Sequence, residues 1–420
     1  MSSAHNQALA QALALHQAGR LTEAETAYRA ALEQPGVPRT EALKNYGFLL
    51  HRLHRFREAV AILSEAVKLN PQDAPQDPDV LLALGHCARE ANDHRTAMTA
   101  LRAAAKVAPE RQDIAEALSA YLSRLIPAWH FPMLADTARN QAYEKAIAKA
   151  ASGAERVLDI GTGSGLLSLF AARAGAKSVT ACEAHPMIAE TAAEIVARNN
   201  LADRIRVIAK RSTELDAARD LGGMADLVVS EVLDAGLLGE GVLATLRDAL
   251  KRLAKPGAKV IPAYADVHVQ ALEIPQPRTV QPLRSIAGFD LSPFDRFRNR
   301  AGHSTLRLEQ VGHSALSAPA TLTRVDFRTP PDWSTPDIRR VTLPITAPGK
   351  LQAFALWFTL WVDEETPVST GPAHLSNGLP CMDHWGQAIL WQAEDRAVTA
   401  GDNIEADFTC ADTFFDLKLV

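Results

Sequence analysis

Two glutamates nine residues apart, Glu231 and Glu240, are the residues of this chain best suited to carry out chemistry. They lie in the segment SEVLDAGLLGEG, which continues the apolar run ADLVV, so Glu231 is expected at the carboxyl end of a buried strand. Two carboxylates can accept hydrogen bonds from the planar, permanently charged fork of a guanidinium. The spacing therefore predicts a site that holds an arginine side chain, and the round ammonium of lysine suits it less well.

A glycine-rich turn lies upstream, in the motif VLDIGTGSGLL (157–167). Such a turn lets the backbone approach a ligand and opens a helix whose first N–H groups are free. The next strand, SVTACEA, brings Glu183 to a point 24 residues after Asp159, close to the interval at which an acidic residue meets ribose hydroxyls. The loop lacks the GxGxxG spacing of nicotinamide enzymes, which favours S-adenosylmethionine as the cofactor. The residues expected to bind it here are Asp159, Gly161, Gly163, Gly165 and Glu183.

Strands that alternate with helices must position both motifs. Further apolar strands are expected at RIRVIA (204–209) and ADLVVSE (225–231). This alternation predicts a mostly parallel, doubly wound α/β domain of the Rossmann-like class over residues 151–262. Beyond it, apolar and polar residues alternate with a period of two, which predicts an antiparallel β-barrel over residues 263–420 for substrate binding and dimerisation.

The first 115 residues repeat with a period of 35 and then 38 residues. Within each repeat, residues where two helices would cross closely recur at spacings of twelve, four and three. The three sets are Ala12, Ala24, Tyr28 and Ala31, then Gly47, Ala59, Leu63 and Ala66, then Gly85, Ala97, Leu101 and Ala104. The pattern is that of tetratricopeptide repeats, an α-helical array whose groove binds a peptide or protein partner. A generic alanine-rich bundle is the plain alternative. Residues 116–150 are expected to form a helical link that completes the cofactor site.

The composition excludes several classes of protein. The chain has 420 residues, enough for two or three domains, with 47% hydrophobic and 22% charged residues. A net charge of −5 gives no basic footprint, so a nucleic-acid partner is not expected. Four scattered cysteines form no CxxC pair, so neither a metal site nor a disulfide framework is expected. Without a signal peptide or an apolar stretch of about 18 residues, we expect a cytoplasmic protein with no membrane contact.

From Trp129 to its end, about 290 residues, the chain resembles the protein arginine methyltransferases, which depend on S-adenosylmethionine. The motif DHWGQ (383–387) is similar to the family's threonine-histidine-tryptophan loop, with Asp in place of Thr. The other matching motifs, in order, are MLADTAR (133–139), VLDIGTGSG, SEVLDAGLLGEG and GFDLSPF (288–294). The glutamate loop most resembles the branch with the monomethylating enzyme, and a relative in that family also carries N-terminal tetratricopeptides.

The resemblance implies an arginine pocket built by four residues. Glu231 and Glu240 would hold the guanidinium in line with the methyl group of the cofactor, and Met133 and Trp385 would form its walls. The family also has an arm in its barrel domain that makes a head-to-tail dimer, and the segment between Pro275 and His303 lies where that arm is expected.

Other matches imply roles next to this pocket. Arg139 and His130 correspond to residues that meet the carboxylate of the cofactor, although a packed histidine at a helix start explains His130 nearly as well. Asp136 and His384 correspond to a pair that joins the helix to the barrel. That pair either passes on the released proton or serves only as a structural hydrogen bond.

The sequence departs from the family at two places. The tyrosine-phenylalanine-x-x-tyrosine helix is absent, since the matching region reads YLSRLIPAWHF, so the lid over the pocket must be built differently. Many relatives have a glutamate at the adenine position, where this chain reads KRSTEL, and Ser212 or Thr213 is expected to replace it.

The expected activity is methyl transfer from S-adenosylmethionine to an arginine of a protein or peptide, by a homodimer. Two alternatives remain open. One is a methyltransferase of the same fold that acts on a small molecule or peptide. The other is a catalytically weak protein that binds partners through its repeats, which the joint presence of Glu231, Glu240, Glu183, Arg139 and His384 disfavours.

Overall fold

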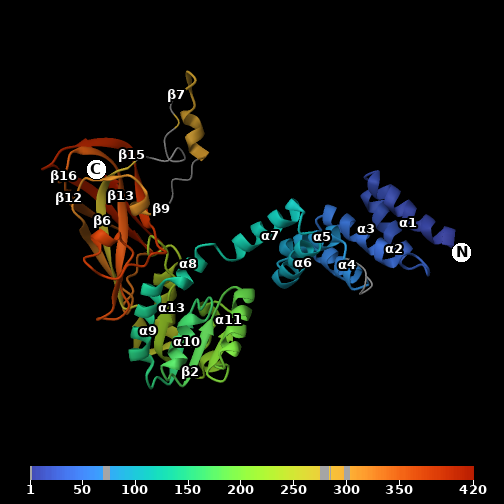
Figure 1. Ribbon diagram of the computed structural model, residues 1–420, viewed down its shortest axis with the longest axis horizontal. Helices are drawn as coiled ribbons and strands as arrows, with labels where there is room; N and C mark the ends of the chain where they lie inside the picture. The colour runs from blue at the N-terminus through green and yellow to red at the C-terminus, as the bar shows by residue number, and fades with distance from the viewer. Residues whose placement is uncertain (1, 70–75, 275–282, 284, 298–302) are drawn as a thin grey trace. The chain divides into compact units, whose positions relative to one another are not determined.

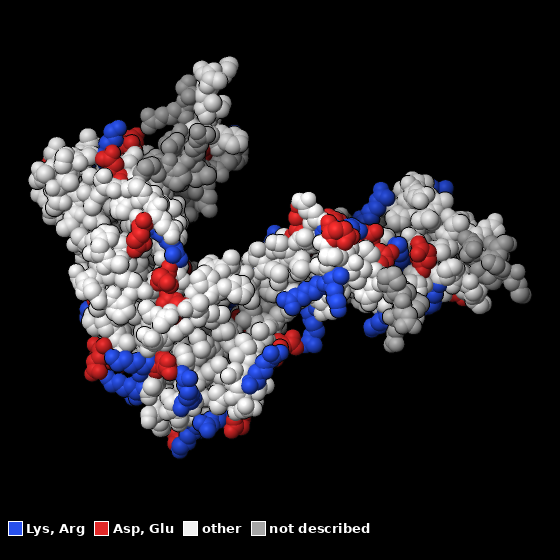
Figure 2. Space-filling view, viewed as in Figure 1, with Lys and Arg blue, Asp and Glu red and all other residues white. Residues whose placement is uncertain are grey.

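The computed structural model describes residues 2–69, 76–274, 283, 285–297 and 303–420. The chain divides into two compact units, Met1–His130 and Phe131–Val420 (Figure 1). Acidic and basic side chains are interspersed over the face shown in Figure 2. Within the described ranges, every helix is too short or too polar to cross a lipid bilayer.

The first unit is a succession of helices in which each helix packs against the next (Figure 1). Its three-residue turns reverse the chain through residues with positive φ at Gly19, His54 and Asn92, and these positions recur with the repeat period of the sequence. The helices are α1 (Ser2–Gln17), α2 (Leu21–Leu32), α3 (Arg39–Arg52), α4 (Phe56–Leu69), α5 (Pro78–Glu90), α6 (His94–Val107) and α7 (Gln112–Leu125).

Two glycines allow the helices of this unit to cross closely. A Cβ atom on Gly47 of α3 would lie 2.3 Å from Leu63 of α4, and one on Gly85 of α5 would lie 2.6 Å from Leu101 of α6. Such distances are far below van der Waals contact, so any larger residue would push the helices apart. The aligned positions of the sequence are therefore the positions at which the helices touch.

The helical link expected over residues 116–150 is not a single element. Helix α7 packs against α6 through Ile114 and Tyr121, so the first unit extends past residue 115 to His130. The helix ends because Pro127 disfavours a helical conformation at the residue before it. Two further helices follow, α8 (His130–Ala135) and α9 (Thr137–Ala151).

After the helices α8 and α9, the second unit forms a parallel sheet of strand order β3-β2-β1-β4-β5. This order confirms the Rossmann-like arrangement expected from alternating strands and helices. The strands are β1 (Arg156–Ile160), β2 (Ser178–Cys182), β3 (Ile205–Ile208), β4 (Ala225–Ser230) and β5 (Ala254–Ile261). The helices between them are α10 (Leu166–Arg173), α11 (Pro186–Arg198), α12 (Ala217–Leu221) and α13 (Val242–Arg252), and a short 3-10 helix, η1, covers Ser212–Glu214.

The remainder of this unit is antiparallel. One sheet contains β6 (Tyr264–Glu273), β9 (Ser304–Leu306), β10 (Ser314–Ala315), β11 (Ala320–Asp326), β13 (Gly349–Trp361), β14 (Pro367–Ser369) and β15 (Gln387–Val398). A second sheet contains β12 (Asp337–Pro344), β16 (Asn403–Ala411) and β17 (Phe414–Leu419), and a small hairpin pairs β7 (Ser285–Ile286) with β8 (Phe289–Asp290). The short strands β9, β10 and β14 were not predicted, because two or three residues show no periodicity.

A single hydrophobic core joins the parallel and antiparallel sheets. Leu227 and Val229 of β4 belong to the same buried cluster as Phe354 and Phe358 of β13. Helix α9 also contributes to this cluster, through Tyr143 and its neighbours. The sheets of the second unit therefore hold one another in place, so loops from both can form a single rigid site.

Candidate active site

The candidate site forms where three neighbouring parallel strands end. Ile160 of β1 pairs with Cys182 of β2 and with Ser230 of β4, so these strands end at the same edge of the sheet. The glycine loop follows β1, Glu183 follows β2, and Glu231 follows β4. Ligands bind at such an edge in open α/β sheets, and the sequence placed all three segments there correctly.

The glycine loop is shaped by close packing. Gly161 has a φ of +72°, and a Cβ atom there would lie 2.7 Å from the side chain of Val232. Glu183 ties the loop to the next helix, because its carboxylate accepts hydrogen bonds from the N–H groups of Gly163 (3.2 Å) and His185 (2.9 Å). Gly165, also at positive φ, begins α10. The loop is thus held by one close contact, at Gly161, and by positive φ at all three glycines, a backbone conformation that other residues rarely adopt.

Asp159 lies beneath this loop rather than at its surface. It is 1% exposed, and its Oδ2 atom accepts hydrogen bonds from the hydroxyl groups of Thr162 and Ser168, both at 2.6 Å. Burial raises the pKa of this carboxyl group, and the two hydroxyls only partly offset that effect. Asp159 therefore braces the loop, and its expected contact with a cofactor stays a prediction.

Glu231 forms a buried ion pair with Arg139. The Nε atom of Arg139 lies 2.8 Å from both carboxylate oxygens, and its Nη2 atom also donates to Glu231. The two side chains are 4% and 6% exposed. The remaining nitrogen, Nη1, donates to Asn140 at 2.7 Å, and the guanidinium lies 5.5 Å from the ring centre of Tyr143. The residue expected to meet the cofactor carboxylate therefore neutralises the first glutamate here.

Glu240 lies near the end of the loop that begins at Glu231, just before α13. The loop bends because Asp234 accepts a hydrogen bond from the N–H group of Gly239 at 2.9 Å, and a Cβ atom on Gly239 would clash with that carboxylate at 2.2 Å. Glu240 keeps exposed surface, yet its carboxyl group is partly withdrawn from water. This withdrawal, followed by the charges of Asp234 and Glu231, raises the pKa of Glu240 to about 7. A positively charged ligand would favour its ionised form.

Asp136 and His384 form a second buried pair, as the resemblance implied. His384 Nδ1 lies 2.7 Å from Asp136 Oδ2, and the side chains are 3% and 1% exposed. Asp136 also begins α9, since its Oδ1 atom accepts the N–H of Arg139 at 2.8 Å. Burial disfavours the charge of Asp136, but the hydrogen bonds from His384 and from the N–H of Arg139 outweigh it and lower the pKa of Asp136 to about 2.

Five other residues were expected in or next to the site. Trp385 packs its ring edge-on against Phe358, at 5.6 Å between ring centres. Met133 lies on α8 and accepts the N–H of Asp136 at 3.2 Å through its carbonyl oxygen. In η1, Ser212 is buried and Thr213 is exposed. His130 is the last residue of the first unit and the first residue of α8.

Sequence reasoning missed several residues that shape the site. Asp234 stands five residues before Gly239, and this spacing could have indicated a loop cap. Tyr143 follows Arg139 by four residues, so the two share a helix face. His303 was not foreseeable, because it returns from the arm segment to lie 3.7 Å from Asp234, against Gly236. Among the described residues, no three His, Cys, Asp or Glu side chains gather as metal ligands would.

Two family models match the second unit. Residues 141–263 match the model described as ribosomal protein L11 methyltransferase, and residues 263–415 match the arginine methyltransferase oligomerization subdomain. The solved PRMT1 enzyme–prozyme heterotetrameric complex of Trypanosoma brucei with AdoHcy is 26% identical, with a TM-score of 0.58. That likeness covers 69% of this chain and 89% of the other. Arabidopsis thaliana protein arginine methyltransferase 10 has a similar fold (TM-score 0.53, 22% identity, 69% and 97% coverage).

Curated relatives identify the family. An arginine N(omega)-methyltransferase of Streptomyces achromogenes subsp. streptozoticus is 37% identical over 300 residues, covering 70% of this chain and 81% of that protein. Mouse protein arginine N-methyltransferase 9 is 30% identical over 403 residues, covering 88% of this chain and 46% of the relative. The chain thus spans about half the length of such animal relatives and most of the bacterial one. Since its glycine loop, its glutamate pair and its Asp136–His384 pair also lie in one rigid body, the chain belongs to the arginine methyltransferase family.

Proposed function

We propose that this protein transfers a methyl group from S-adenosylmethionine to a guanidinium nitrogen of an arginine. The observation that carries this proposal is the position of Glu231 and Glu240, on one loop at the strand edge where the glycine loop and Glu183 also lie. The cofactor supplies an electrophilic methyl group on a sulfonium and leaves as S-adenosylhomocysteine, a neutral thioether. The glycine loop and Glu183 are the parts of the site best placed to meet its ribose end.

The two glutamates would bind and orient the acceptor. Each carboxylate can accept hydrogen bonds from one side of the guanidinium fork, which leaves one nitrogen directed at the methyl group. A new N–C bond forms while the S–C bond breaks, and the methylated guanidinium must then lose one proton. Glu240, whose pKa is about 7, is able to hold that proton near neutral pH, and the Asp136–His384 pair is a second candidate for passing it on.

In this scheme, Arg139 and the acceptor arginine both interact with the carboxylate of Glu231. In the absence of ligands it satisfies Glu231, and its fork points to the same strand edge as the glycine loop. We propose that Arg139 also meets the carboxylate of the cofactor, with Ser212 or Thr213 at the adenine end and Met133 and Trp385 around the acceptor. His130 is proposed as a further contact of the cofactor, carried by the resemblance alone.

The acceptor is proposed to be arginine within a protein or peptide. The animal relatives bear the name protein arginine N-methyltransferase, and the match to the mouse protein covers 88% of this chain, so it includes part of the helical unit. Free arginine, or another small guanidino compound, is a second candidate. The bacterial relative, of which this chain covers 81%, is named for arginine without mention of protein.

Mass spectrometry separates these acceptors. The protein would be incubated with S-adenosylmethionine and either an arginine-rich peptide or free arginine, with Glu231→Gln as the inactive control. We expect a mass increase of one methyl group on an arginine, absent with the control. Further increments would exclude a purely monomethylating enzyme. Transfer to free arginine alone would favour the small-molecule acceptor, and no transfer to either, while the cofactor still binds, would contradict the proposal.

The helical unit is proposed to be a tetratricopeptide array that binds a protein partner. Its support is the recurrence of close crossings at Gly47 and Gly85 and of left-handed turns at His54 and Asn92 with one period. The division expected from the sequence is also proposed, with the array over 1–115, a link over 116–150, the cofactor domain over 151–262 and a β-barrel over 263–420. A cytoplasmic location and the absence of a nucleic-acid or membrane partner remain part of this proposal.

We further propose a homodimer. Four large apolar side chains are exposed in the arm segment, Ile286, Phe289, Leu291 and Phe294, with Phe289 71% exposed. Residues 275–282, 284 and 298–302 of that segment lie outside the described residues. The family model matched from residue 263 onward is named for oligomerization. Sedimentation equilibrium at micromolar concentration should give a mass near twice 45.3 kDa, and a mass of one chain would contradict this proposal.

A further inference from the structure

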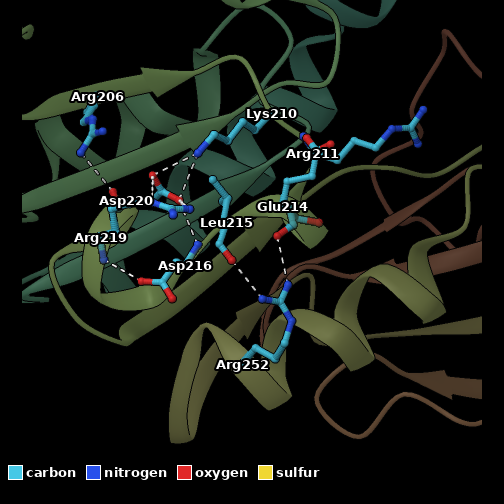
Figure 3. Close-up of polar contacts among 10 residues, drawn as sticks. Arg206, Lys210, Arg211, Glu214, Leu215, Asp216, Arg219, Asp220 and Arg252 are labelled. Carbon is cyan, nitrogen blue, oxygen red and sulfur yellow. Dashed lines mark hydrogen bonds and ion pairs between the residues drawn. The ribbon is translucent and has the colours of Figure 1, made fainter.

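Side chains from two helices hold the segment that carries Ser212 (Figure 3). It runs from Lys210 to Asp216, between the end of β3 and the start of α12, so no strand partner holds its backbone. Its only regular structure is the single turn η1, in which the carbonyl oxygens of Arg211 and Ser212 accept the N–H groups of Glu214 (3.0 Å) and Leu215 (3.1 Å). The N–H of Arg211 also donates to the side chain of Glu214 at 3.0 Å. Short 3-10 turns are weak on their own, so external contacts must set its position.

Arg252 supplies the contacts on one side. Its Nη1 atom donates to the carbonyl oxygen of Leu215 at 2.9 Å, and its Nη2 atom donates to the carbonyl oxygen of Ser212 at 3.2 Å (Figure 3). Asp248, one turn earlier on α13, accepts from Nε at 2.7 Å and from Nη2 at 2.5 Å. The guanidinium plane is therefore fixed by its own helix, and it presents a rigid pair of donors to both ends of the turn.

Asp220 supplies the contacts on the other side. It is 4% exposed, and its carboxylate accepts the N–H of Asp216 at 2.9 Å, the amino group of Lys210 at 3.3 Å and the fork of Arg219 at 3.0 Å (Figure 3). The hydrogen bond from Arg219 and the N–H of Asp216 lower the pKa of Asp220, so it stays ionised at neutral pH. This carboxylate joins both ends of the segment to α12, and Arg252 supplies the side-chain contacts from α13 to the turn between them.

We propose that Arg252 is a positioning residue for the adenine end of the cofactor. It holds the backbone of Ser212 and Leu215 at a fixed place, so the polar groups of the turn are already in position when the adenine ring arrives. Fixing such a segment in advance removes an ordering cost from binding. Arg252 ends α13, the helix that begins just after Glu240, so one helix supports both the cofactor side and the acceptor side of the site.

This inference rests on the proposed place of the adenine next to Ser212. Its test measures cofactor binding only, so it is independent of the acceptor and of methyl transfer. The probes are S-adenosylhomocysteine and its inosine analogue, in which oxygen replaces the adenine amino group. Dissociation constants would be measured by isothermal titration calorimetry for the full chain.

The variant is Arg252→Met, which keeps the apolar stem and removes both donors. The matched control is Lys251→Met, which removes one positive charge from an exposed residue at the same helix end. The milder variant Arg252→Lys keeps the charge and can reach one carbonyl, so it serves if Arg252→Met folds poorly. Thermal unfolding of each ligand-free variant records any general loss of stability.

For Arg252→Met we expect S-adenosylhomocysteine to bind about tenfold more weakly, comparable to the loss of one charged hydrogen bond. The inosine analogue should weaken less than about threefold, so the preference for adenine shrinks. Arg252→Lys should lie between, and Lys251→Met should match the wild type. Equal weakening of both ligands, or unchanged binding of both, would overturn the inference even if the variant melts at a lower temperature.

Discussion

With Glu240 as a proposed ligand of the acceptor arginine, its raised pKa should make acceptor binding depend on pH. A guanidinium binds to an ionised carboxylate, and Glu240 ionises with a pKa of about 7 in the ligand-free protein. About a tenth of the protein then has Glu240 ionised at pH 6, and about nine tenths at pH 8. At low acceptor concentration, kcat/KM for an arginine peptide should therefore rise about tenfold between these pH values, with a midpoint near 7.

Initial rates measured across this pH range, at subsaturating peptide and saturating S-adenosylmethionine, provide the assay. Asp234→Asn is the informative variant, because it keeps the oxygen that accepts the N–H of Gly239 and removes one of the two charges that raise the pKa of Glu240. The midpoint should move to lower pH in this variant, while binding of S-adenosylhomocysteine stays independent of pH. A wild-type midpoint below about pH 5.5, or one that Asp234→Asn leaves in place, would refute the reasoning.

The same shift has a consequence for stability, with a definite sign. The folded protein holds the proton of Glu240 more tightly than the unfolded chain does, between the ordinary pKa and about 7. The contribution of this group to stability is therefore complete at low pH and declines as the pH rises through that window. Glu240→Gln should remove the decline, so the variant would be inactive yet at least as stable as the wild type at pH 8, measured by urea unfolding.

Three further perturbations follow from the packed pairs. Glu231→Gln should abolish turnover. It should also lower the free energy of unfolding by about 3 kcal/mol, because Arg139 keeps a buried charge without a counterion. A free energy of urea unfolding equal to that of the wild type would contradict the buried pair. Asp136→Asn keeps the helix cap but loses the charge opposite His384. The free energy of unfolding should fall by about 2 kcal/mol at pH 7 and by only about 1 kcal/mol at pH 3, measured by urea titration at both pH values. Gly85→Ala should destabilise the helical unit by about 1–3 kcal/mol, visible as a lower melting temperature, and an unchanged one would disprove the close crossing.

Much of the catalytic unit was predictable because one physical rule places it. Parallel strands share the edge at which they end, so the apolar runs before Gly161, Glu183 and Glu231 were enough to bring their loops together. The close crossings at Gly47 and Gly85 were predictable because such a crossing demands a small residue. The Asp136–His384 pair, 248 residues apart in sequence, came only from the family resemblance.

The features that escaped prediction depend on contacts with no sequence period. Arg139 was assigned to the cofactor, and its pairing with Glu231 across 92 residues follows from burial of both side chains in the ligand-free state. The packing of α7 against α6 was not predicted either, because the apolar face of α7 does not reveal which neighbour it covers. Arg252 had no signal at all, since a basic residue at a helix end is ordinarily explained by the helix dipole.

In the proposed reaction, Arg139 competes with the acceptor arginine for the carboxylate of Glu231. In that reaction, an acceptor arginine that binds Glu231 replaces Arg139 there, so its binding is an exchange of one guanidinium for another. The gain in free energy is the difference between two similar interactions and stays small. The methylated product carries the same charge as the substrate but has one N–H donor fewer. Arg139 should therefore displace the product from Glu231 more readily than it displaces the substrate. Such an exchange would favour turnover over tight retention of product.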